Sequence, residues 1–535
     1  MLTAQDDARL SSCWNLRDQL VMGARFTRDV PRFLRNRESL DVALAHIRIR
    51  LQQRAPRLLR AVKQAVYEHP ASPYLALLQQ AGCEYGDLVR LVRQEGVEGA
   101  LTVLAERDVY VTYDETAGRR EIVRGSFRRQ YADTDFNNPL VRPHFTSQTG
   151  GSGGRAKPLR QGLEWGYEVG WDFAATLDAH GVRNAAFVFW MTAPIFWLLL
   201  VPRLGHRIIG WFHPLKQTPR TYTAGARYLS LLARLGGATI PMPRHLDLQQ
   251  PERMARWLAA RLERERPIVL CCPVSSSVRV ALAAQDAGLS LDGLSIIAMG
   301  EPTTPERRRH LEAAGAQVLT RYSTMESGPI AAGCAAPTAA DDSHIFLDRF
   351  AVIDRPRTST TDPDAAHIPS LLVSNLNQLD IKMLLNAETG DYGSRDIRDP
   401  ECCGLGRLGL TSHIWNIRSF EKLSGEGVSF ARSQIDRIIE HTLPARFGGT
   451  AVDYQLVEEA GPNGNVRLVL RVAPSCGDLD DDRIRDAFLA ALADGTVSDR
   501  YQAALLERAQ SVTVRRERPQ ATPGGKMLPF HALHE

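Results

Sequence analysis

Short apolar runs alternate with stretches of helical spacing through the middle of the chain, between about residues 142 and 415. Such alternation is typical of a layered α/β domain, in which helices cover the faces of a sheet. This pattern constrains the fold more strongly than any single motif does. The apolar runs are Ala185–Trp190, Ile268–Cys272, Leu294–Ala298 and Val318–Thr320, and one of the helical stretches between them is Glu252–Glu265.

The two ends of the chain have different patterns. Residues up to about 140 are rich in arginine and helical in spacing, as in Leu88–Glu106. Near the other end, Val452–Val457 and Val466–Val472 flank the turn sequence Gly461-Pro-Asn-Gly-Asn. Two apolar runs joined by such a turn predict a β-hairpin.

A capped helix from Asp480 and a strand at Ser511–Arg515 are expected to follow this hairpin. The expected fold class is therefore α/β, with a large layered N-terminal domain and a small α+β C-terminal domain. We expect the large domain to cover residues 1–417, of which 1–140 form a helical part, and the small domain to cover residues 418–535.

Composition excludes several classes of protein. The chain has 535 residues, and 65 Lys+Arg against 61 Asp+Glu leave a net charge of +4, which offers no dedicated surface for nucleic acid. With 44% hydrophobic and 24% charged residues, the chain is globular rather than disordered or collagen-like. Its length exceeds one ordinary core, so at least two domains are expected.

The sequence also bears on compartment. The N-terminal residues from Met1 are acidic and polar without an apolar signal core, and eight cysteines in so long a chain do not make a disulfide framework. We therefore expect a reduced, cytoplasmic protein. The long apolar run Ala185–Val201 carries Pro194 near its middle and is short for a membrane span. We expect a buried strand, a turn and the start of a buried helix there.

Lysine is scarce in this chain. Only six of the 65 basic residues are lysines, and the others are arginines. Because arginine supplies charge almost everywhere else, each lysine is a candidate for a more specific role. The six are Lys63, Lys157, Lys216, Lys382, Lys422 and Lys526.

One lysine ends the glycine-rich segment Thr149-Gly-Gly-Ser-Gly-Gly-Arg-Ala-Lys157. Consecutive backbone N–H groups in such a turn form a nest for phosphate oxygens, while hydroxyls add donors and the lysine neutralises charge. It is not a Walker loop, because Pro158 stands where the magnesium-binding hydroxyl would be. A flexible linker is the alternative. The candidate phosphate ligands are Thr149, Gly150, Gly151, Ser152, Gly153, Gly154 and Lys157.

This segment resembles the phosphate loop of the adenylate-forming superfamily, which includes acyl-CoA synthetases, carrier-loading adenylation domains and luciferases. Gly153 departs from the family pattern. Further motifs follow in the family's chain order. The segment Gly300-Glu301-Pro302 looks like the one that packs on adenine, and Tyr322-Ser-Thr-Met-Glu326 is similar to the aromatic-Gly-x-Thr-Glu motif. Thr389-Gly-Asp391 resembles the ribose-binding motif.

The resemblance implies a role for each of these residues. Tyr322 would stack on the purine, and Asp391 would accept both ribose hydroxyls. Glu326 would hold magnesium. Ser323, a candidate nucleotide ligand, replaces the usual glycine, and Met325 stands where the family has threonine. The hydroxyl that meets the α-phosphate or the acyl carboxylate would therefore be that of Thr324.

The C-terminal motifs imply a mobile lid. The sequence Arg418-Ser-Phe-Glu421 through Gly425 is similar to the family's hinge motif, and Ser433-Gln-Ile-Asp436 continues it as in the phenylacetate–CoA ligase branch. Pro523-Gly-Gly-Lys526 lies where the family keeps its catalytic lysine. The resemblance therefore implies that residues 418–535 rotate about the hinge and carry Lys526 to and from the site.

A second cluster has metal-ligand character. Cys334 and His344 form a C-x9-H pair, and Cys402 and Cys403 are adjacent further on. The phenylacetate–CoA ligase branch resembles this grouping, and four such ligands would close a tetrahedral structural zinc site. The adjacent cysteines depart from the branch's spacing, and buried free thiols are the alternative.

The expected function is that of an ATP- and Mg²⁺-dependent ligase. It would form an acyl-adenylate from a carboxylic acid and transfer the acyl group to a thiol, with CoA as the first choice. One alternative is an adenylation enzyme that passes the acyl group to a phosphopantetheine carrier protein or an amine, and another is a degenerate adenylate-binding protein. Aromatic residues at Trp190, Phe196 and Trp197 hint at an aryl or medium apolar acid.

Overall fold

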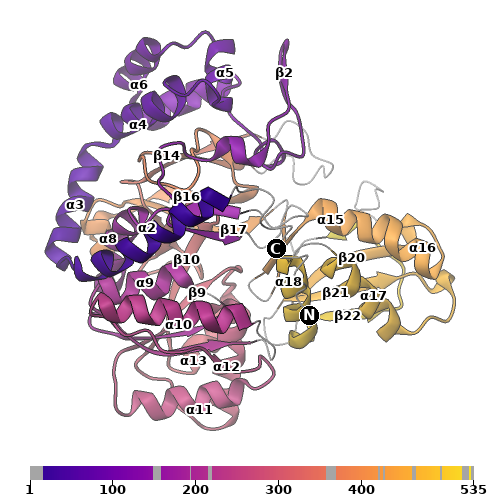
Figure 1. Cartoon of the computed structure of the whole chain (residues 1–535). Helices are drawn as coiled ribbons and strands as arrows, with labels where there is room; N and C mark the ends of the chain where they lie inside the picture. The colour runs from indigo at the N-terminus through magenta and orange to yellow at the C-terminus, as the bar shows by residue number, and fades with distance from the viewer. Residues whose placement is uncertain are drawn as a thin grey trace.

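The structure is a computed structural model that describes residues 16–148, 158–192, 194–214, 220–356, 369–419, 422–425, 428–460, 466–494, 497–520 and 529–531. These residues build a large unit around a ten-stranded sheet and a small unit around a four-stranded sheet. The two units lie side by side (Figure 1). The expected α/β fold class is confirmed, while the division at residues 417 and 418 stays a proposal.

The large sheet is parallel in one half and antiparallel in the other. Its strand order is β16-β17-β12-β11-β10-β9-β8-β5-β6-β7. The strands from β7 to β10 pair in parallel, and those from β10 to β16 pair antiparallel, so β10 belongs to both halves. The bounds are β5 (Ala186–Trp190), β6 (Arg207–His213), β7 (Arg244–His245), β8 (Ile268–Pro273), β9 (Leu294–Met299), β10 (Gln317–Thr324), β11 (Gly328–Gly333), β12 (Ser343–Ile345), β16 (Asp391–Ile397) and β17 (Ser412–Ser419).

The four apolar runs predicted in the middle of the chain are all strands of the parallel half. Parallel strands are covered by helices on both faces, so nearly all their side chains are buried. Phe187 and Phe189 of β5 pack in one core cluster, whereas Val188 and Trp190 pack in another. This division follows from the alternation of side chains along a strand.

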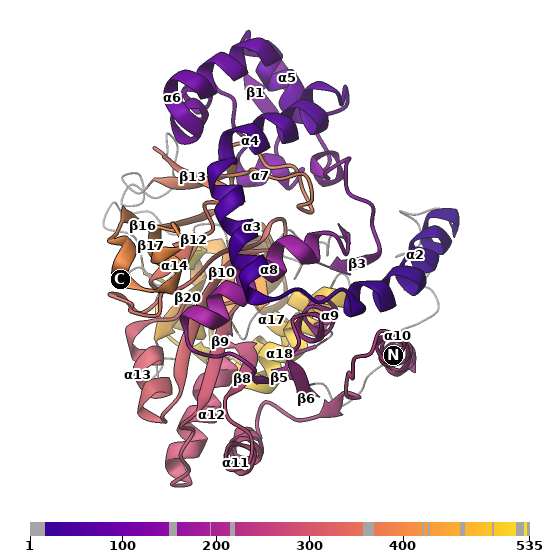
Figure 2. The ribbon, with the colours of Figure 1, turned by 90° about the vertical axis from the view of Figure 1, so that its left-hand side faces the viewer.

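Two layers of helices cover the parallel strands. The first packs with Phe187 and Phe189, and the second with Val188 and Trp190. Figure 2 shows α11 and α12 on the side of the strands away from α8. The first layer is α8 (Trp165–Ala179), α9 (Ile195–Arg203) and α10 (Arg220–Leu235), and the second is α11 (Pro251–Leu262), α12 (Val274–Asp286) and α13 (Pro305–Ala313).

The N-terminal part is helical, as expected. Helices α4 to α6 lie at an end of the molecule away from the small unit (Figure 1). Their core is shared with a three-stranded sheet of order β13-β14-β15. The bounds are α2 (Leu16–Arg35), α3 (Leu40–Gln52), α4 (Arg54–Val62), α5 (Pro73–Gln80), α6 (Tyr85–Glu106), α7 (Tyr113–Thr116), β1 (Ile122–Arg124), β2 (Phe127–Arg129), β13 (Phe350–Arg355), β14 (Ser370–Asn375), β15 (Ala387–Glu388) and α14 (Gly404–Arg407).

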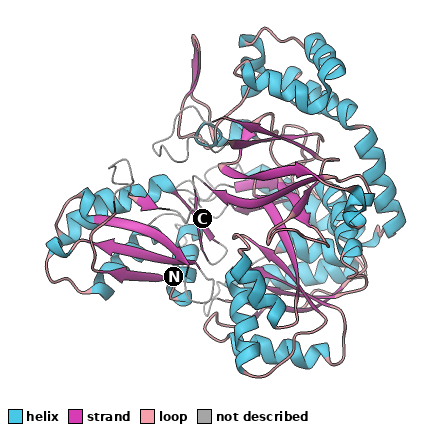
Figure 3. Ribbon diagram, turned by 180° about the vertical axis from the view of Figure 1, so that it is seen from behind, coloured by secondary structure: helices cyan, strands magenta, loops and turns pink. Residues whose placement is uncertain are grey.

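The small unit confirms the predicted hairpin, capped helix and strand. Strands β20 and β21 pair antiparallel, and the Asp480 side chain accepts the N–H groups of Asp482 and Arg483 at the start of α17. Figure 3 shows both units from behind. The bounds are β18 (Lys422–Gly425), β19 (Val428–Ala431), α15 (Arg432–Arg437), α16 (Leu443–Phe447), β20 (Tyr454–Ala460), β21 (Val466–Val472), α17 (Asp481–Ala493), α18 (Val497–Ala509), β22 (Val512–Arg515) and β23 (Phe530–His531).

The long apolar run of the sequence lies inside the large unit. Residues Ala186–Trp190 form β5 and residues Ile195–Arg203 begin a helix, α9, with Pro194 as its N-cap. Both elements contribute to buried core clusters. Among the described residues, none of the helices combines the length and the apolar character that crossing a bilayer would require.

Candidate functional site

Strand β10 carries three of the residues predicted for nucleotide binding and catalysis, Tyr322, Ser323 and Thr324, and Glu326 follows directly after it. The first half of the strand pairs in parallel with β9, and the second half pairs antiparallel with β11. Ligands of α/β sheets bind at the carboxyl ends of the parallel strands. The predicted residues therefore lie at the position in the sheet where a ligand site is expected.

The phenol of Tyr322 joins β10 to the predicted ribose motif. Its oxygen lies 3.0 Å from Oδ2 of Asp391 and 3.2 Å from Oγ1 of Thr389. All three residues are buried, and burial together with the charge of Asp391 raises the pKa of the phenol. Tyr322 thus stays protonated and donates to the carboxylate, which restricts how Asp391 can point.

Arg418, the first residue of the predicted hinge motif and a candidate nucleotide ligand, lies on the neighbouring strand. Asp391 begins β16, where it is the partner of Ser419 in β17, and Tyr392 is the partner of Arg418. The Ser419 hydroxyl donates to the carbonyl of Gly390 at 3.1 Å. The predicted ribose motif and the predicted hinge motif, which are distant in the sequence, therefore lie on adjacent strands at one edge of the large sheet.

Two polar side chains, Thr324 and Glu326, lie at the end of β10 and in the turn after it. Oγ1 of Thr324 lies 2.8 Å from Oγ of Ser327 and accepts the backbone N–H of Ser327 at 3.2 Å. The Glu326 side chain is half-buried and has no hydrogen bond or ion pair with a residue that the structure describes. Carboxylate oxygens are ligands that Mg²⁺ prefers, so Glu326 fits the magnesium role.

A tryptophan from α8 packs tightly against this turn. Gly328 has a φ of 72°, and a Cβ atom placed on it would lie 2.2 Å from Cζ2 of Trp165. The Trp165 indole N–H donates to Oδ1 of Asp380 at 3.0 Å, which holds the ring in place. Only glycine fits at position 328, because any side chain would displace the indole and strain the backbone. The sequence analysis identified neither Gly328 nor Trp165 as part of the site.

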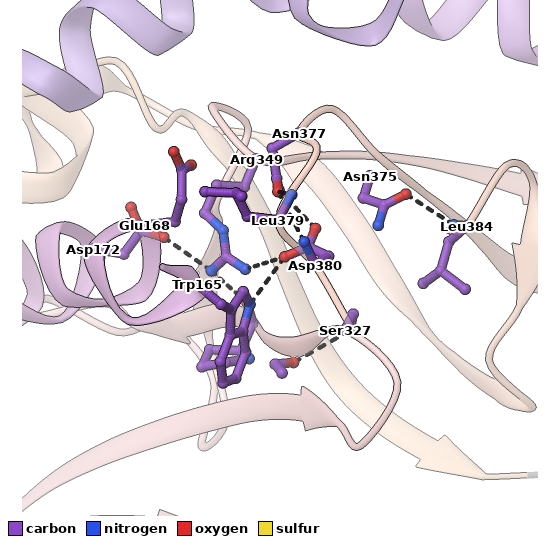
Figure 4. Close-up of polar contacts among 12 residues, drawn as sticks. Trp165, Glu168, Asp172, Ser327, Arg349, Asn375, Asn377, Leu379, Asp380 and Leu384 are labelled. Carbon is purple, nitrogen blue, oxygen red and sulfur yellow. Dashed lines mark hydrogen bonds and ion pairs between the residues drawn. The ribbon is translucent and has the colours of Figure 1, made fainter. Parts of the chain in front are cut away.

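A buried charge network anchors Trp165 from behind (Figure 4). The Arg349 guanidinium lies 2.9 Å from Asp380 and 3.1 Å from Asp172 of α8, and these side chains are essentially inaccessible to solvent. Arg50 of α3 also contacts Asp172, at 2.5 Å. The network ties α3, α8 and the segment after β14 together beneath the turn. Its members are isolated charges in the sequence, so no spacing pattern could reveal it.

The segment predicted to pack on adenine follows β9. The Glu301 side chain points inward, where the Ser275 hydroxyl donates to it and Arg307 lies 3.2 Å away. Gly300 has a φ of 80°, which turns the chain sharply after the strand. The Glu301 carboxylate is thus occupied by a structural pair, and the segment can offer a ligand mainly its backbone and Pro302.

Two predicted motifs lie outside the described residues. These are the glycine-rich segment Thr149–Lys157, with its candidate ligands Gly150, Gly151, Ser152, Gly153 and Gly154, and the catalytic candidate Lys526. The residues that flank the first segment form β3 (Phe145–Gln148) and β4 (Pro158–Gln161), which pair antiparallel with Gln148 opposite Pro158. Both motifs remain predictions.

The predicted metal ligands come together from distant parts of the chain. Cys334, His344, Cys402 and His413 each present a ligand atom within 4.8 Å of the others. Cys403 is also close, with its sulfur 3.0 Å from Nε2 of His344. His413 was missed by sequence reasoning, because nothing in its spacing ties it to the cysteines. It is the partner of His344 across β12 and β17.

The donor set fits zinc. Nδ1 of His344 lies 2.6 Å from the carbonyl of Leu410, and Nδ1 of His413 lies 2.8 Å from Oδ1 of Asp342. An acceptor at Nδ1 favours the tautomer whose Nε2 lone pair is free for a metal. Two such nitrogens beside the buried thiol of Cys334 and the half-buried thiol of Cys402 are the donor types that a closed structural zinc site uses.

Comparisons with known proteins give structural relatives only. No family model matches the chain, and no curated protein matches it. The chain is similar to a solved 2-hydroxyisobutyryl-CoA ligase in complex with 2-HIB-AMP and CoA, with a TM-score of 0.49 and 16% identity over 93% of this chain and 91% of that one. It is also similar to a mutant of the amide bond synthetase McbA from Marinactinospora thermotolerans, with a TM-score of 0.43 and 16% identity over 89% and 92%.

A third similar structure is an AMP-forming acyl-CoA synthetase/AMP-acid ligase II-like protein from Dyadobacter fermentans. Its TM-score is 0.29, with 12% identity over 72% of this chain and 87% of that one. By their printed names, these structural relatives are a CoA ligase, an amide bond synthetase and an AMP-forming synthetase-like protein.

Proposed function

We propose that this chain is an ATP-dependent carboxylic acid ligase of the adenylate-forming type. The observation that carries the proposal is the meeting of Tyr322, Asp391 and Glu326 at the end of β10. A buried phenol–carboxylate pair suits a nucleoside. The half-buried Glu326 carboxylate, which pairs with none of the described residues, suits the magnesium of a nucleotide. These are three groups that ATP binding needs, in one place.

In the first half-reaction, an oxygen of the substrate carboxylate attacks the α-phosphorus of ATP and pyrophosphate leaves. Both reactants are anions, so catalysis consists mainly of positioning and charge neutralisation. Asp391 anchors the ribose, and the Thr149–Lys157 segment grips the pyrophosphate end. Glu326 would hold Mg²⁺, which would supply charge neutralisation to the phosphates when bound.

Lys526 is assigned to the reacting centre in this proposal. An ammonium on a flexible stem can approach the carboxylate and the α-phosphate together, which a planar guanidinium does less easily. In a chain that otherwise uses arginine for charge, a lysine at this position has a specific task. Residues 418–535 act as the lid that brings Lys526 in and withdraws it for the second half-reaction.

In the second half-reaction, a nucleophile attacks the acyl carbon and AMP leaves with the P–O bond intact. We assign the thiol of CoA as this nucleophile. The alternatives are the phosphopantetheine thiol of a carrier protein and an amine. Glu326 and Asp391, both present with suitable surroundings, argue against a degenerate protein that binds adenylate without turnover.

We also propose a structural zinc ion held by residues from Cys334, His344, Cys402, Cys403 and His413. The support is that the free nitrogens of two oriented histidines face buried thiols. The cluster ties the strands β12 and β17 to the segment around Cys402 and Cys403. Since β17 also carries Arg418, the zinc would stiffen the strand that leads into the lid.

The deciding experiment is ATP–pyrophosphate exchange over a panel of carboxylic acids. Exchange that depends on an acid supports the ligase, and ATP binding without exchange on any acid supports a degenerate binder. Hydroxylamine, CoA and amines, added in turn to the preformed adenylate, then identify the acceptor. A protein that shows neither exchange nor an ATP-dependent rise in melting temperature would overturn the proposal.

A further inference from the structure

Arg321 is a cation that the proposed reaction does not use. It precedes Tyr322 on β10, and the alternation of side chains along a strand directs the two residues to opposite faces of the sheet. Tyr322 packs with the N-terminal core, whereas Leu319, two residues before Arg321, packs with α8 and α9. A group that contacts Arg321 therefore approaches from the side opposite the proposed ribose site.

Two aromatic rings enclose the Arg321 guanidinium. It lies 4.9 Å from the ring centre of Phe173 in α8 and 4.3 Å from that of Trp197 in α9. The two rings also contact each other edge to face, with their centres 5.4 Å apart, so the guanidinium has aromatic neighbours on two sides. A cation over aromatic faces is stabilised, but its N–H donors are not satisfied by the rings.

Among the residues that the structure describes, none accepts a hydrogen bond from Arg321 or forms an ion pair with it. Asp172 is a carboxylate whose charge raises the pKa of the Arg321 guanidinium. Both oxygens of Asp172 are already engaged, one by Arg50 at 2.5 Å and the other by Arg349 at 3.1 Å. Arg50 and Arg349, by contrast, each form ion pairs with at least two carboxylates.

Arg321 remains charged at neutral pH although its surroundings lower its pKa. Burial, the largest cause, lowers the pKa of its guanidinium to about 10, which still leaves it protonated. The residue remains half-buried rather than fully enclosed, so it is accessible from one side. A charged fork of donors that lies against two aromatic rings and has no hydrogen-bond or ion-pair partner among the described residues is suited to an oxyanion, which it can bind through two parallel hydrogen bonds.

We propose that Arg321 binds a second anionic group, such as a distal carboxylate, on the acid substrate. The inference rests on the proposed function, since it names the class of acid that the ligase would activate. Phe173 and Trp197 would pack on the carbon skeleton between the two ends of that acid. The aromatic residues near Trp197 thus do not by themselves indicate a purely apolar acid.

The test uses matched pairs of acids with the full chain. Each pair consists of a dicarboxylate and the monocarboxylate in which a methyl group replaces the distal carboxylate, for example glutarate with pentanoate and terephthalate with 4-methylbenzoate. Linear and aromatic dicarboxylates of increasing length complete the series. Pyrophosphate exchange and the acid-dependent rise in melting temperature are both measured for the natural chain and for its Arg321→Leu, Arg321→Lys and Arg309→Leu variants.

We expect at least one dicarboxylate to be preferred over its methyl partner. Arg321→Leu should lower kcat/KM for that dicarboxylate about 10- to 100-fold, the worth of a bidentate charge-assisted pair, and leave or improve the methyl partner. Arg321→Lys should lie between, because it keeps the charge without the fork. Arg309 is an exposed arginine of α13, so Arg309→Leu controls for loss of charge alone.

The two readouts separate this inference from the proposed function. If no acid supports exchange but a dicarboxylate raises the melting temperature of the natural chain and not of Arg321→Leu, the ligase is wrong and the anion site stands. If monocarboxylates support exchange and Arg321→Leu changes both members of each pair equally, the ligase stands and the anion site is wrong. If no dicarboxylate supports pyrophosphate exchange and none raises the melting temperature, the anion site is also wrong.

Discussion

The hydroxyl oxygen of Tyr322 lies 3.0 Å from Oδ2 of Asp391, although 69 residues separate the two in the sequence. The contact joins the end of β10 to the start of β16 across the antiparallel half of the large sheet. It places an aromatic ring beside a carboxylate, which is the pairing that a ribose and a purine require. The contact also makes the two residues interdependent.

Replacing Tyr322 with Phe removes this hydrogen bond and keeps the ring. We expect the Kd for ATP to rise about tenfold, since a hydrogen bond to a charged group is worth about 1.5 kcal/mol. Asp391→Asn should weaken binding further. In the double variant the two losses should be less than additive, because they share one interaction. Calorimetric titration measures the Kd for ATP of the natural chain, the two single variants and the double variant. Tyr85→Phe on α6 is the control.

Lys526→Ala tests the assignment of the reacting centre. Loss of a charge that is needed only in the transition state should reduce acid-dependent pyrophosphate exchange by about 100-fold or more, with ATP binding retained. The matched control is Lys63→Ala, which removes an exposed lysine paired with Glu68. Pyrophosphate release by Lys526→Ala at the natural rate would remove this residue from the mechanism.

Metal content tests the zinc proposal. Protein purified without a histidine tag should contain about one zinc per chain, and chelation should lower its melting temperature. His413→Ala should lose the metal, whereas Cys476→Ser, which alters a free cysteine of the small unit, should keep it. Cys402→Ser and Cys403→Ser then show which thiol is the ligand. A folded, metal-free natural protein would contradict the proposal.

Gly328→Ala tests the packing of the turn that carries Glu326. The substitution places a Cβ against the Trp165 ring and puts alanine at a φ of 72°. We expect a loss of more than about 2 kcal/mol in the free energy of unfolding, from backbone strain and overpacking together. Urea denaturation measures it. Gly225→Ala, in α10 with open space around it, should be neutral or slightly stabilising.

The fold was predictable where the sequence pattern is local. The four apolar runs are strands because burial on both faces demands unbroken apolar sequence, and β8 shows this in Ile268–Cys272. The hairpin β20–β21 and the cap at Asp480 follow from turn and capping chemistry that acts within a few residues. Strand order and the change to antiparallel pairing at β10 have no such local signal.

The motif residues of the candidate site could be predicted from the sequence, whereas the residues that pack behind them could not. Tyr322, Glu326 and Asp391 carry recognisable motifs, and the structure brings Tyr322 and Asp391 together. Trp165 and Arg349, which support the turn, belong to a network whose members come from separate elements. The roles of the motif residues stay predictions until the experiments above are made.

The sequence by itself determined which segments become strands and helices and which residues are candidates for chemistry, because propensity, periodicity and motif spacing act over short distances along the chain. Only the tertiary structure decided which of these residues meet. It gathered His413 with Cys334, His344 and Cys402, and it placed Arg321 beside two aromatic rings, where no residue that the structure describes pairs with its charge. Such meetings depend on how whole elements pack, and packing joins residues that no local pattern connects.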